Sequence, residues 1–525
     1  MLSDNRTNKT LFILIGISTI IRAILASNLD LGNDEVYYWT YALYPDWSHF
    51  DHPPMVGFTI QFFSFNLLFD SEFFIRLGAI VFGSVNTFII FKIGQRIKDD
   101  LTGIYAAILY NTSIYSFIIA GTFILPDSPQ LFFWLLSIYF ALGAITSTEI
   151  TKENKKNLLL AGLFIGLGML SKYTTIFIWF GIISYIILYN RKWLKSFSLY
   201  GSILISITLF LPVILWNIQN DFISLSFQGG RVSLLDSSLR PDFLLTEVLG
   251  EFFYNNPVNV VLAIMAIWAF SKRKSDFMGK NSFRLIIWNS APLILVFILF
   301  SMFRRTLPHW TGPGYVTLNI IAAAWLSSIS QKKKYPFMIM GQLRYAIYFL
   351  LVLIVAGLFQ VNCGFVNPDP KNTTETELGK KDISLDLYGW KNIGEGFTAI
   401  FEKDLIAEKM DRDAAIITYR WFPAANLDYY VAQPIGLKLL AIGPLEQIHK
   451  YYWINQDRGG FSLGMDAYYI TTSRNFTDPN TLYKNYFESI EPAGDFPIIR
   501  CEKTVMNVFV YRMKGMKLIP KLKTE

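Results

Sequence analysis

Long apolar runs are the feature that most limits what this chain can fold into. A helix of about 20 mostly apolar residues crosses the hydrocarbon core of a membrane. The runs that approach this length lie at 10–27, 74–95, 101–120, 129–147, 157–170, 173–189, 197–216, 258–271, 285–301, 310–328 and 345–361. We therefore predict a mainly α-helical membrane protein with about eleven transmembrane helices.

The composition agrees with a membrane protein. Hydrophobic residues make up 52% of the 525 positions and charged residues only 17%. The net charge is +7, but the basic residues gather in short segments between apolar runs. This distribution is typical of membrane topology signals rather than of a nucleic-acid-binding surface. We expect membrane lipids, and no nucleic acid, among its partners.

Every second segment between the runs is strongly basic. The positive-inside rule places such segments in the cytoplasm, together with the N-terminus, which carries Arg6 and Lys9. The other segments, 28–73, 121–128, 171–172, 217–257 and 302–309, then face outward, as does the chain after 361. The basic segments contain Lys92, Arg96 and Lys98; Lys152, Lys155 and Lys156; Arg191, Lys192 and Lys195; Lys272, Arg273 and Lys274; and Lys332, Lys333 and Lys334.

Residues 362–525 differ in composition from the rest and contain no further long apolar run. The segments AAIITYR, LKLLAIG and MNVFVYR are typical of buried strands, and IGEGFTAIFEKDLIAEKM has the apolar spacing of an amphipathic helix. We predict a transmembrane domain at 1–361 and a small extracytoplasmic α/β domain at 362–525. Cys363 and Cys501 both fall in this C-terminal part. If it lies outside the cytoplasm they could form a disulfide, and two unpaired thiols are the alternative.

The stretch 33–57 combines acidic residues, histidines and many aromatics between two apolar runs. Charge beside a membrane span lies in water or in a polar cavity and marks a candidate functional site. Asp34, next to Glu35, can act as a general base towards a hydroxyl group. The alternative is that Asn33 or Asp34 caps the helix that follows.

Further polar residues fall in the other outward segments. Asp127 or Ser128 is expected to cap the next helix, and Asp127 can also share a cavity with Asp34. Asp51, His52 and His309 offer oxygen and nitrogen ligands for a divalent cation, although no helical HxxxH spacing is present.

Basic residues are disfavoured on the outward face, yet several lie there, among them Arg231 in 217–257. Arg76, Lys172, Arg304 and Arg305 either extend to the membrane interface without further function or bind an anion such as a lipid phosphate. The aromatics of these segments form an interfacial belt or stack against a sugar ring. They are Tyr37, Tyr38, Trp39, Trp47, Phe50 and Trp310.

Several stretches resemble the multi-span glycosyltransferases of the GT-C class. They are DEVYYWTYAL with FDHPPMVG, then PDSPQLFFW, GLGMLSKYT and RRTLPHWTGPGYVTL. Within that class the chain resembles the bacterial group related to dolichyl-phosphate-mannose–protein mannosyltransferases and to the lipid A aminoarabinose transferase. The resemblance covers most of 10–330, and LYGWKN and TYRWFPAANLDYYV are more loosely similar to the extracytoplasmic tail of that family.

This resemblance implies a GT-C fold and a hexosyl- or pentosyltransferase of the bacterial inner membrane. Such an enzyme transfers a sugar from a polyprenyl phosphate donor to a hydroxyl group of a lipid, glycan or protein acceptor at the outer face. A multi-span transporter or lipid flippase is the alternative, but it would place charges near span midpoints and often show inverted repeats.

The resemblance also suggests roles for individual residues. Asp34 matches the catalytic aspartate of the family's first loop, and Asp127 matches its second acidic position. Asp51 and His52 fall where the aminoarabinose enzyme has a Glu-Lys pair near a metal, so His52 is either a metal ligand or a replacement for the lysine. A divalent metal ion is the candidate cofactor, with His309 as a further ligand, and no organic cofactor is expected. The predicted substrate-binding residues are Glu35, Tyr37, Arg76, Lys172, Arg304 and Arg305.

Overall fold

The computed structural model describes residues 2–147, 149–232, 238–272, 276–332, 341–370 and 372–520. The chain divides into two compact units. The first comprises Met1–Ser27 and Pro45–Leu353, and the second comprises Asn28–Tyr44 and Ile354–Glu525.

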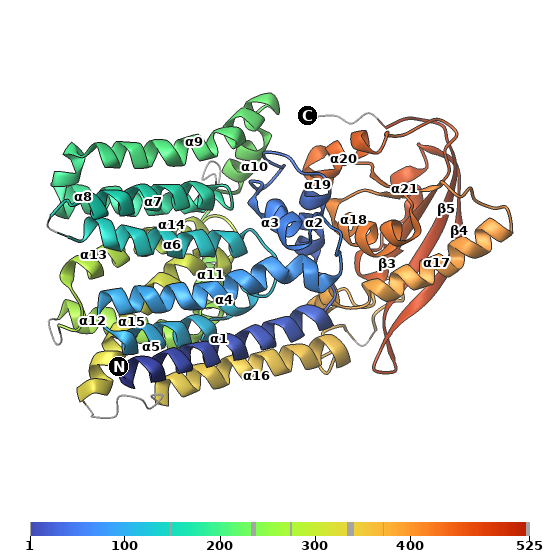
Figure 1. Cartoon of the computed structure of the whole chain (residues 1–525). Coiled ribbons are helices and arrows are strands. Elements are labelled where there is room, and N and C mark those ends of the chain that lie inside the picture. Colours follow the sequence, from blue (N-terminus) through green and yellow to red (C-terminus); the bar gives the residue numbers. More distant parts are fainter. Residues whose placement is uncertain are drawn as a thin grey trace. The chain divides into compact units, whose positions relative to one another are not determined.

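The first unit is built from helices, most of which run alongside one another (Figure 1). Each predicted apolar run is found largely in helix. The helices are α1 (Leu2–Asn28), α3 (Met55–Phe63), α4 (Glu72–Ile97), α5 (Asp100–Thr112), α6 (Asp127–Ile145), α7 (Lys152–Met169), α8 (Ile176–Tyr189), α9 (Phe197–Gln219), α10 (Ile223–Val232), α11 (Pro241–Tyr254), α12 (Pro257–Ser271), α13 (Lys280–Trp288), α14 (Ala291–Ser301), α15 (Gly312–Lys332) and α16 (Gly341–Cys363), whose end belongs to the second unit.

The protein is an integral membrane protein, but the count of about eleven spans is not confirmed. Among the described residues, six helical segments are long and apolar enough to cross a membrane, or seven if α11 and α12, which meet at 94°, form one broken span. The apolar run at 101–120 is one that does not form a single long helix. In it, α5 ends at Thr112 and a π-helix, η1 (Tyr115–Ile119), follows. Arg273, Lys274, Lys333 and Lys334, used in the topology argument, lie outside the described residues.

Small residues bring helices of the first unit together. A Cβ atom at Gly94 of α4 would lie 2.7 Å from the Cα atom of Gly103 of α5, so the two backbones meet at a distance that only glycine permits. Close approach over small residues is typical of helix pairs in membranes. In contrast, α1 exposes Phe12, Ile17 and Ile20, as expected for a helix that faces lipid.

An arginine inside this unit holds the π-helix in place. The Arg22 side chain of α1 is fully buried. It donates a hydrogen bond of 2.9 Å to Oδ1 of Asn111 in α5, and its guanidinium lies 4.3 Å from the centre of the Phe117 ring in η1. A buried charge in a membrane helix is costly unless polar or aromatic groups surround it. These contacts join α1, α5 and η1, the segment that leads towards Asp127.

The second unit is the predicted α/β structure, and strands and a helix are found where the sequence indicated them. The sheet order is β2-β1-β3-β5-β4; β1 is parallel to β2 and β3, whereas β5 is antiparallel to β3 and β4. The elements are α2 (Asn33–Leu43), α17 (Trp390–Ile406), β1 (Ala415–Thr418), α18 (Trp421–Leu427), β2 (Leu439–Ala441), α19 (Leu445–Ile448), α20 (Tyr451–Asp457), β3 (Ala467–Thr472), α21 (Pro479–Tyr483), β4 (Phe487–Arg500) and β5 (Lys503–Met516).

Successive residues of β3 point to opposite faces of this sheet, as strand geometry requires. The Tyr468 ring packs against Phe397 and Phe401 of α17, with ring centres 5.1 and 5.9 Å apart. The Tyr469 ring packs against Tyr483 of α21 at 5.2 Å. The sheet therefore has an apolar layer on each face.

The helix α2 packs within the second unit, although we predicted it as part of the first outer loop, 28–73, of the transmembrane domain. The backbone N–H of Leu31 donates to the Tyr430 hydroxyl at 2.6 Å, and Nε of Arg458 donates to the Tyr44 hydroxyl at 2.9 Å. These hydrogen bonds join positions about 400 residues apart, a distance in sequence that no local pattern spans.

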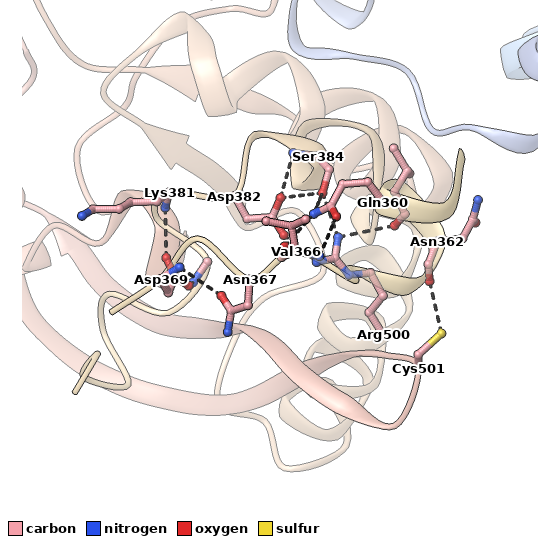
Figure 2. A network of polar contacts seen from close by, with 12 residues as sticks. Gln360, Asn362, Val366, Asn367, Asp369, Lys381, Asp382, Ser384, Arg500 and Cys501 are labelled. Carbon is pink, nitrogen blue, oxygen red and sulfur yellow. Dashed lines mark hydrogen bonds and ion pairs between the residues drawn. The ribbon is translucent and has the colours of Figure 1, made fainter. Parts of the chain in front are cut away.

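Figure 2 shows a polar network in which the chain after α16 meets the end of β4. Arg500 is buried and forms an ion pair of 2.5 Å with Asp382, and its Nη1 donates to Ser384 at 2.9 Å. Cys501 lies beside this network, where its Sγ donates to the backbone oxygen of Asn362 at 3.5 Å. Both Cys363 and Cys501 are exposed free thiols in this structure.

Candidate functional site

The first unit contains a buried ion pair made by two predicted site residues. Nζ of Lys172 lies 2.8 Å from Oδ2 of Asp127, and the Tyr115 hydroxyl donates to Oδ1 at 3.1 Å. Asp127 is the first residue of α6 and Lys172 follows α7. The positive end of the α6 dipole further favours a carboxylate at this position.

The capping role considered for Asp127 is not observed. The residue before α6 is Pro126, and no side chain caps the helix. Ser128 instead closes the preceding turn by accepting a hydrogen bond from Leu125 and donating one to the carbonyl of Phe123. The Asp127 carboxylate is therefore available to the ion pair rather than consumed by the local backbone.

Two histidines lie within electrostatic range of this pair. Burial lowers the pKa of His52 to about 4, with Asp51 acting in the opposite direction and Lys172 reinforcing the shift. Burial likewise lowers the pKa of His309 to about 4, against the opposing effect of Asp127. Both imidazoles are therefore neutral at pH 7, so the positive charge of the group comes from Lys172 and from Arg231 of α10, which also affects both histidines.

Arg231 is held by aromatic rings. Its guanidinium lies 5.4 Å from the ring centre of Phe227 and 5.1 Å from that of Trp310. No carboxylate forms an ion pair with Arg231 in the part of the chain that the structure describes. It therefore differs from Lys172, whose ammonium group is engaged by Asp127.

Contacts between α10 and two other segments bring these charged and polar residues close together. The Tyr173 hydroxyl and Ser224 of α10 are hydrogen bonded at 2.8 Å, and the Phe50 and Phe227 rings pack at 4.6 Å. Gln228 donates to the backbone carbonyl of Asp51. Segments around 50, 127, 172, 231 and 309 are thus brought together, which no spacing in the sequence indicates. We call Asp127, Lys172, His52, His309 and Arg231 the polar cluster.

Asp34 and Glu35 have different environments in α2. Oε2 of Glu35 accepts a hydrogen bond of 2.9 Å from the backbone N–H of Gly32, so Glu35 satisfies the start of the helix. Asp34 is exposed, and the N-cap position is held by Gly32. Neither Asn33 nor Asp34, the two residues considered for the cap, therefore holds that position.

Tyr37, predicted to bind substrate, is buried in the second unit. Its ring packs against Trp421 at 5.0 Å and Tyr41 at 5.3 Å, and its hydroxyl accepts a hydrogen bond from the Lys450 backbone at 3.4 Å. The Tyr37 ring thus packs against other side chains of this unit, and substrate binding by Tyr37 stays a prediction.

The other three cations that we predicted to bind substrate, Arg76, Arg304 and Arg305, differ in their environments. Arg76 is fully buried; its Nη1 donates to the carbonyl of Ala26 at 3.0 Å, and its guanidinium lies 5.2 Å from the Phe123 ring centre. It thereby satisfies a carbonyl in the last turn of α1, which lacks an intrahelical partner. Arg304 is half-buried and Arg305 is exposed. Anion binding by these three remains a prediction.

The predicted metal site was tested on its ligands. Within the described ranges, no three or more His, Cys, Asp or Glu side chains are gathered so that they could hold a metal ion. Asp51, His52 and His309 therefore do not form such a donor set. A divalent ion can also be held by one or two carboxylates together with substrate phosphate, so a metal cofactor stays a prediction, and no step of the chemistry proposed below depends on one.

Sequence reasoning assigned no role to Tyr115, which contacts the polar cluster, or to Arg231, which belongs to it. Tyr115 lies within a predicted span, and the only signal was the polar Asn111-Thr112-Ser113 that precedes it. A Cβ atom at Gly312 would overlap the Tyr115 ring, which shows how closely this ring is enclosed. Arg231 was recognised as an outward cation in 217–257, but nothing local assigned it a role.

Comparison with known proteins supports the resemblance predicted from the sequence. Residues 51–216 match the family model described as dolichyl-phosphate-mannose-protein mannosyltransferase. This range includes His52, Asp127 and Lys172. No match was found among curated protein sequences.

Two solved structures share the fold. The crystal structure of ArnT from Cupriavidus metallidurans in the apo state has a TM-score of 0.60 at 12% identity, covering 95% of this chain and 97% of that one. The same protein bound to undecaprenyl phosphate has a TM-score of 0.63, with 12% identity and the same coverage. These comparisons confirm the resemblance to GT-C class glycosyltransferases related to the mannosyltransferases and ArnT.

Proposed function

We propose that the protein is a membrane glycosyltransferase that transfers a sugar from a polyprenyl-phosphate-linked donor to a hydroxyl acceptor. The family description names a dolichyl phosphate sugar, and the ArnT of similar fold has been crystallised with undecaprenyl phosphate. The acceptor is a lipid, glycan or protein at the extracytoplasmic face of a bacterial inner membrane.

The observation that carries this proposal is the polar cluster. It combines a buried Asp127–Lys172 ion pair, two histidines that are neutral at pH 7 and the Arg231 guanidinium. A membrane protein retains buried charge of this kind at functional sites. A phosphate monoester on a lipid carrier is an anion that such cations attract.

The proposed reaction is a substitution at the anomeric carbon of the donor sugar. The acceptor oxygen forms a bond to that carbon while the bond from carbon to the phosphate oxygen breaks. Polyprenyl phosphate leaves as a stable anion, so it needs little help from a general acid, unlike the leaving group in glycoside hydrolysis. The proton of the acceptor hydroxyl passes to the base, for which we propose Asp34.

The Asp127–Lys172 ion pair bears on which cation we propose for the phosphate. Lys172 was predicted for this role, but its ammonium group forms a 2.8 Å ion pair with Asp127. We propose that Arg231 makes the main contact with phosphate, because a guanidinium presents two parallel donors to a phosphate group. Lys172 then orients Asp127 and adds positive potential to the cluster.

The direct test is transfer of radiolabelled sugar from a polyprenyl phosphate donor by the purified protein. We expect the labelled sugar to move from the lipid fraction to an acceptor fraction extracted from a bacterial envelope. An Arg231→Gln variant should raise the donor KM more than it lowers kcat, because it removes a contact to the phosphate that is already made in the ground state. Absence of transfer with every donor sugar supplied would reject the proposed activity.

The proposed topology predicts opposite accessibility for two exposed lysines. After Cys363 and Cys501 are replaced by serine, Lys155→Cys should resist, and Lys438→Cys should accept, a membrane-impermeant thiol reagent added to intact cells or spheroplasts. The reason is that basic segments between spans stay in the cytoplasm. Permeabilised cells provide the control, in which both cysteines should react. Labelling of position 155 from outside without labelling of 438 would invert the proposed orientation.

A further inference from the structure

The second unit contains a pocket of about 400 Å³ that the proposed transfer reaction does not use. It is lined by three short segments. Tyr419 and Arg420 directly follow β1, and 473–477 directly follows β3. The segment from Thr376 to Lys380 lines another side.

The topology of the sheet explains why a pocket forms at this place. In the order β2-β1-β3-β5-β4, the chain leaves β1 towards β2 on one side and leaves β3 towards β4 and β5 on the other. The loops at the carboxyl ends of the parallel pair β1 and β3 therefore diverge. In open α/β sheets, ligands bind in the crevice at such a switch point. Pocket and topology thus indicate the same site independently.

Hydrogen bonds hold the walls of this pocket. The hydroxyls of Tyr419 and Thr477 are bonded at 2.9 Å and connect the two loops. Ser473 donates to the carbonyl of Leu378 at 2.6 Å, and Nε of Arg474 donates to that of Gly379 at 3.2 Å. The segment around 378 is therefore fastened to the loop after β3, which makes the pocket a preformed feature of the fold.

The charge of the lining favours an anion. The lining contains three cations, Lys380, Arg420 and Arg474, and one carboxylate, Glu377. Glu377 lies 3.6 Å from Lys380, and Arg474 is paired with Asp386 at 2.8 Å. The Arg420 side chain is exposed, and its guanidinium lies 4.9 Å from the centre of the Tyr419 ring. Among the described residues, Arg420 is the lining cation for which no ion pair is present.

The rest of the lining suits a carbohydrate. Thr376 and Asn475 supply polar groups, and Tyr419 and Phe476 supply half-buried rings. Aromatic rings beside a few convergent polar groups are the usual lining of a small-molecule site. We propose that this pocket binds an anionic sugar, meaning a monosaccharide unit that carries a phosphate or a carboxylate, with Arg420 as the residue that contacts its charge. The proposal concerns binding by the second unit and does not depend on transferase activity.

The test uses the purified full-length protein in detergent and isothermal titration calorimetry with four probes. Glucose 1-phosphate carries the phosphate, glucuronate carries the carboxylate, and glucose and inorganic phosphate each lack one half of the proposed ligand. We expect at least one anionic sugar to bind more tightly than both glucose and inorganic phosphate. Equal binding of glucose, equal binding of inorganic phosphate, or no binding of either anionic sugar would overturn the proposal. The better of the two anionic sugars identifies the charged group.

Variants locate the site. Arg420→Glu should weaken binding of the anionic sugar at least about tenfold, the loss expected when a charge-assisted hydrogen bond is removed, and Arg420→Gln should have a smaller effect in the same direction. The matched control is Arg412→Glu, because Arg412 is also exposed and lies before β1, at the opposite end of that strand. An unchanged affinity in Arg420→Glu, or an equal loss in Arg412→Glu, would place the ligand elsewhere. The melting temperature of each variant verifies that it remains folded.

Discussion

Replacing Asp34 with asparagine is expected to leave a folded protein whose sugar transfer is about 10²- to 10⁴-fold slower, the range typical of a lost general base. Asparagine has nearly the same size but accepts no proton. The structure sharpens this expectation, since Glu35 and not Asp34 bonds the Gly32 N–H at the start of α2. The substitution should therefore change the chemistry without removing a helix cap. The measurement is kcat for transfer with saturating donor and acceptor.

Glu35→Gln is the matched control for that experiment. Glu35 is only 2% exposed, and the glutamine oxygen can still accept the hydrogen bond from Gly32, so transfer should fall less than in Asp34→Asn. The melting temperature in detergent should change little in either variant. A folded Asp34→Asn protein with near wild-type kcat would show that Asp34 is not the base.

Replacing Lys172 with alanine should destabilise the first unit by about 3–5 kcal/mol, the usual cost of leaving one partner of a buried ion pair without its counter-charge. Asp127 is 2% exposed, and the hydrogen bond that Tyr115 donates to it does not neutralise its charge. Sugar transfer should fall as well, because the cluster loses positive potential near the donor phosphate. Thermal unfolding in detergent and the initial rate of transfer measure the two effects separately.

Two further variants separate structure from function at this pair. The double variant Lys172→Met with Asp127→Asn removes both charges and should recover much of the lost stability, while transfer stays low. Arg240→Ala is the control, since Arg240 forms a 2.7 Å ion pair with Asp242 in which both side chains are exposed, and such pairs contribute little to stability. If Lys172→Ala were no more destabilising than Arg240→Ala, the buried pair would not contribute as proposed. If the double variant transferred sugar normally, the pair would have no role in the reaction.

Local sequence patterns were sufficient to predict most of the secondary structure. The apolar runs coincide largely with helices, and AAIITYR, LKLLAIG and MNVFVYR contain β1, β2 and part of β5. Hydrophobic periodicity and run length are properties of neighbouring residues, so one sequence reveals them. The count of spans could not be obtained in the same way, because the 94° bend between α11 and α12 depends on how helices pack and not on apolar content.

The sequence by itself determined that this is a helical membrane protein with an α/β unit near its C-terminal end, and it identified Asp127, Lys172, His52 and His309 as unusual polar residues. Only the tertiary structure decided how those residues are used. The Asp127–Lys172 pair joins positions 45 residues apart, Glu35 accepts the hydrogen bond from the Gly32 N–H at the start of α2, and Arg231 joins the cluster through the Trp310 ring. The physical reason is that the burial of apolar segments leaves a pattern in the local sequence. The interaction of a charged side chain depends instead on its distance to a partner and on its burial, and both are defined only after the helices have packed.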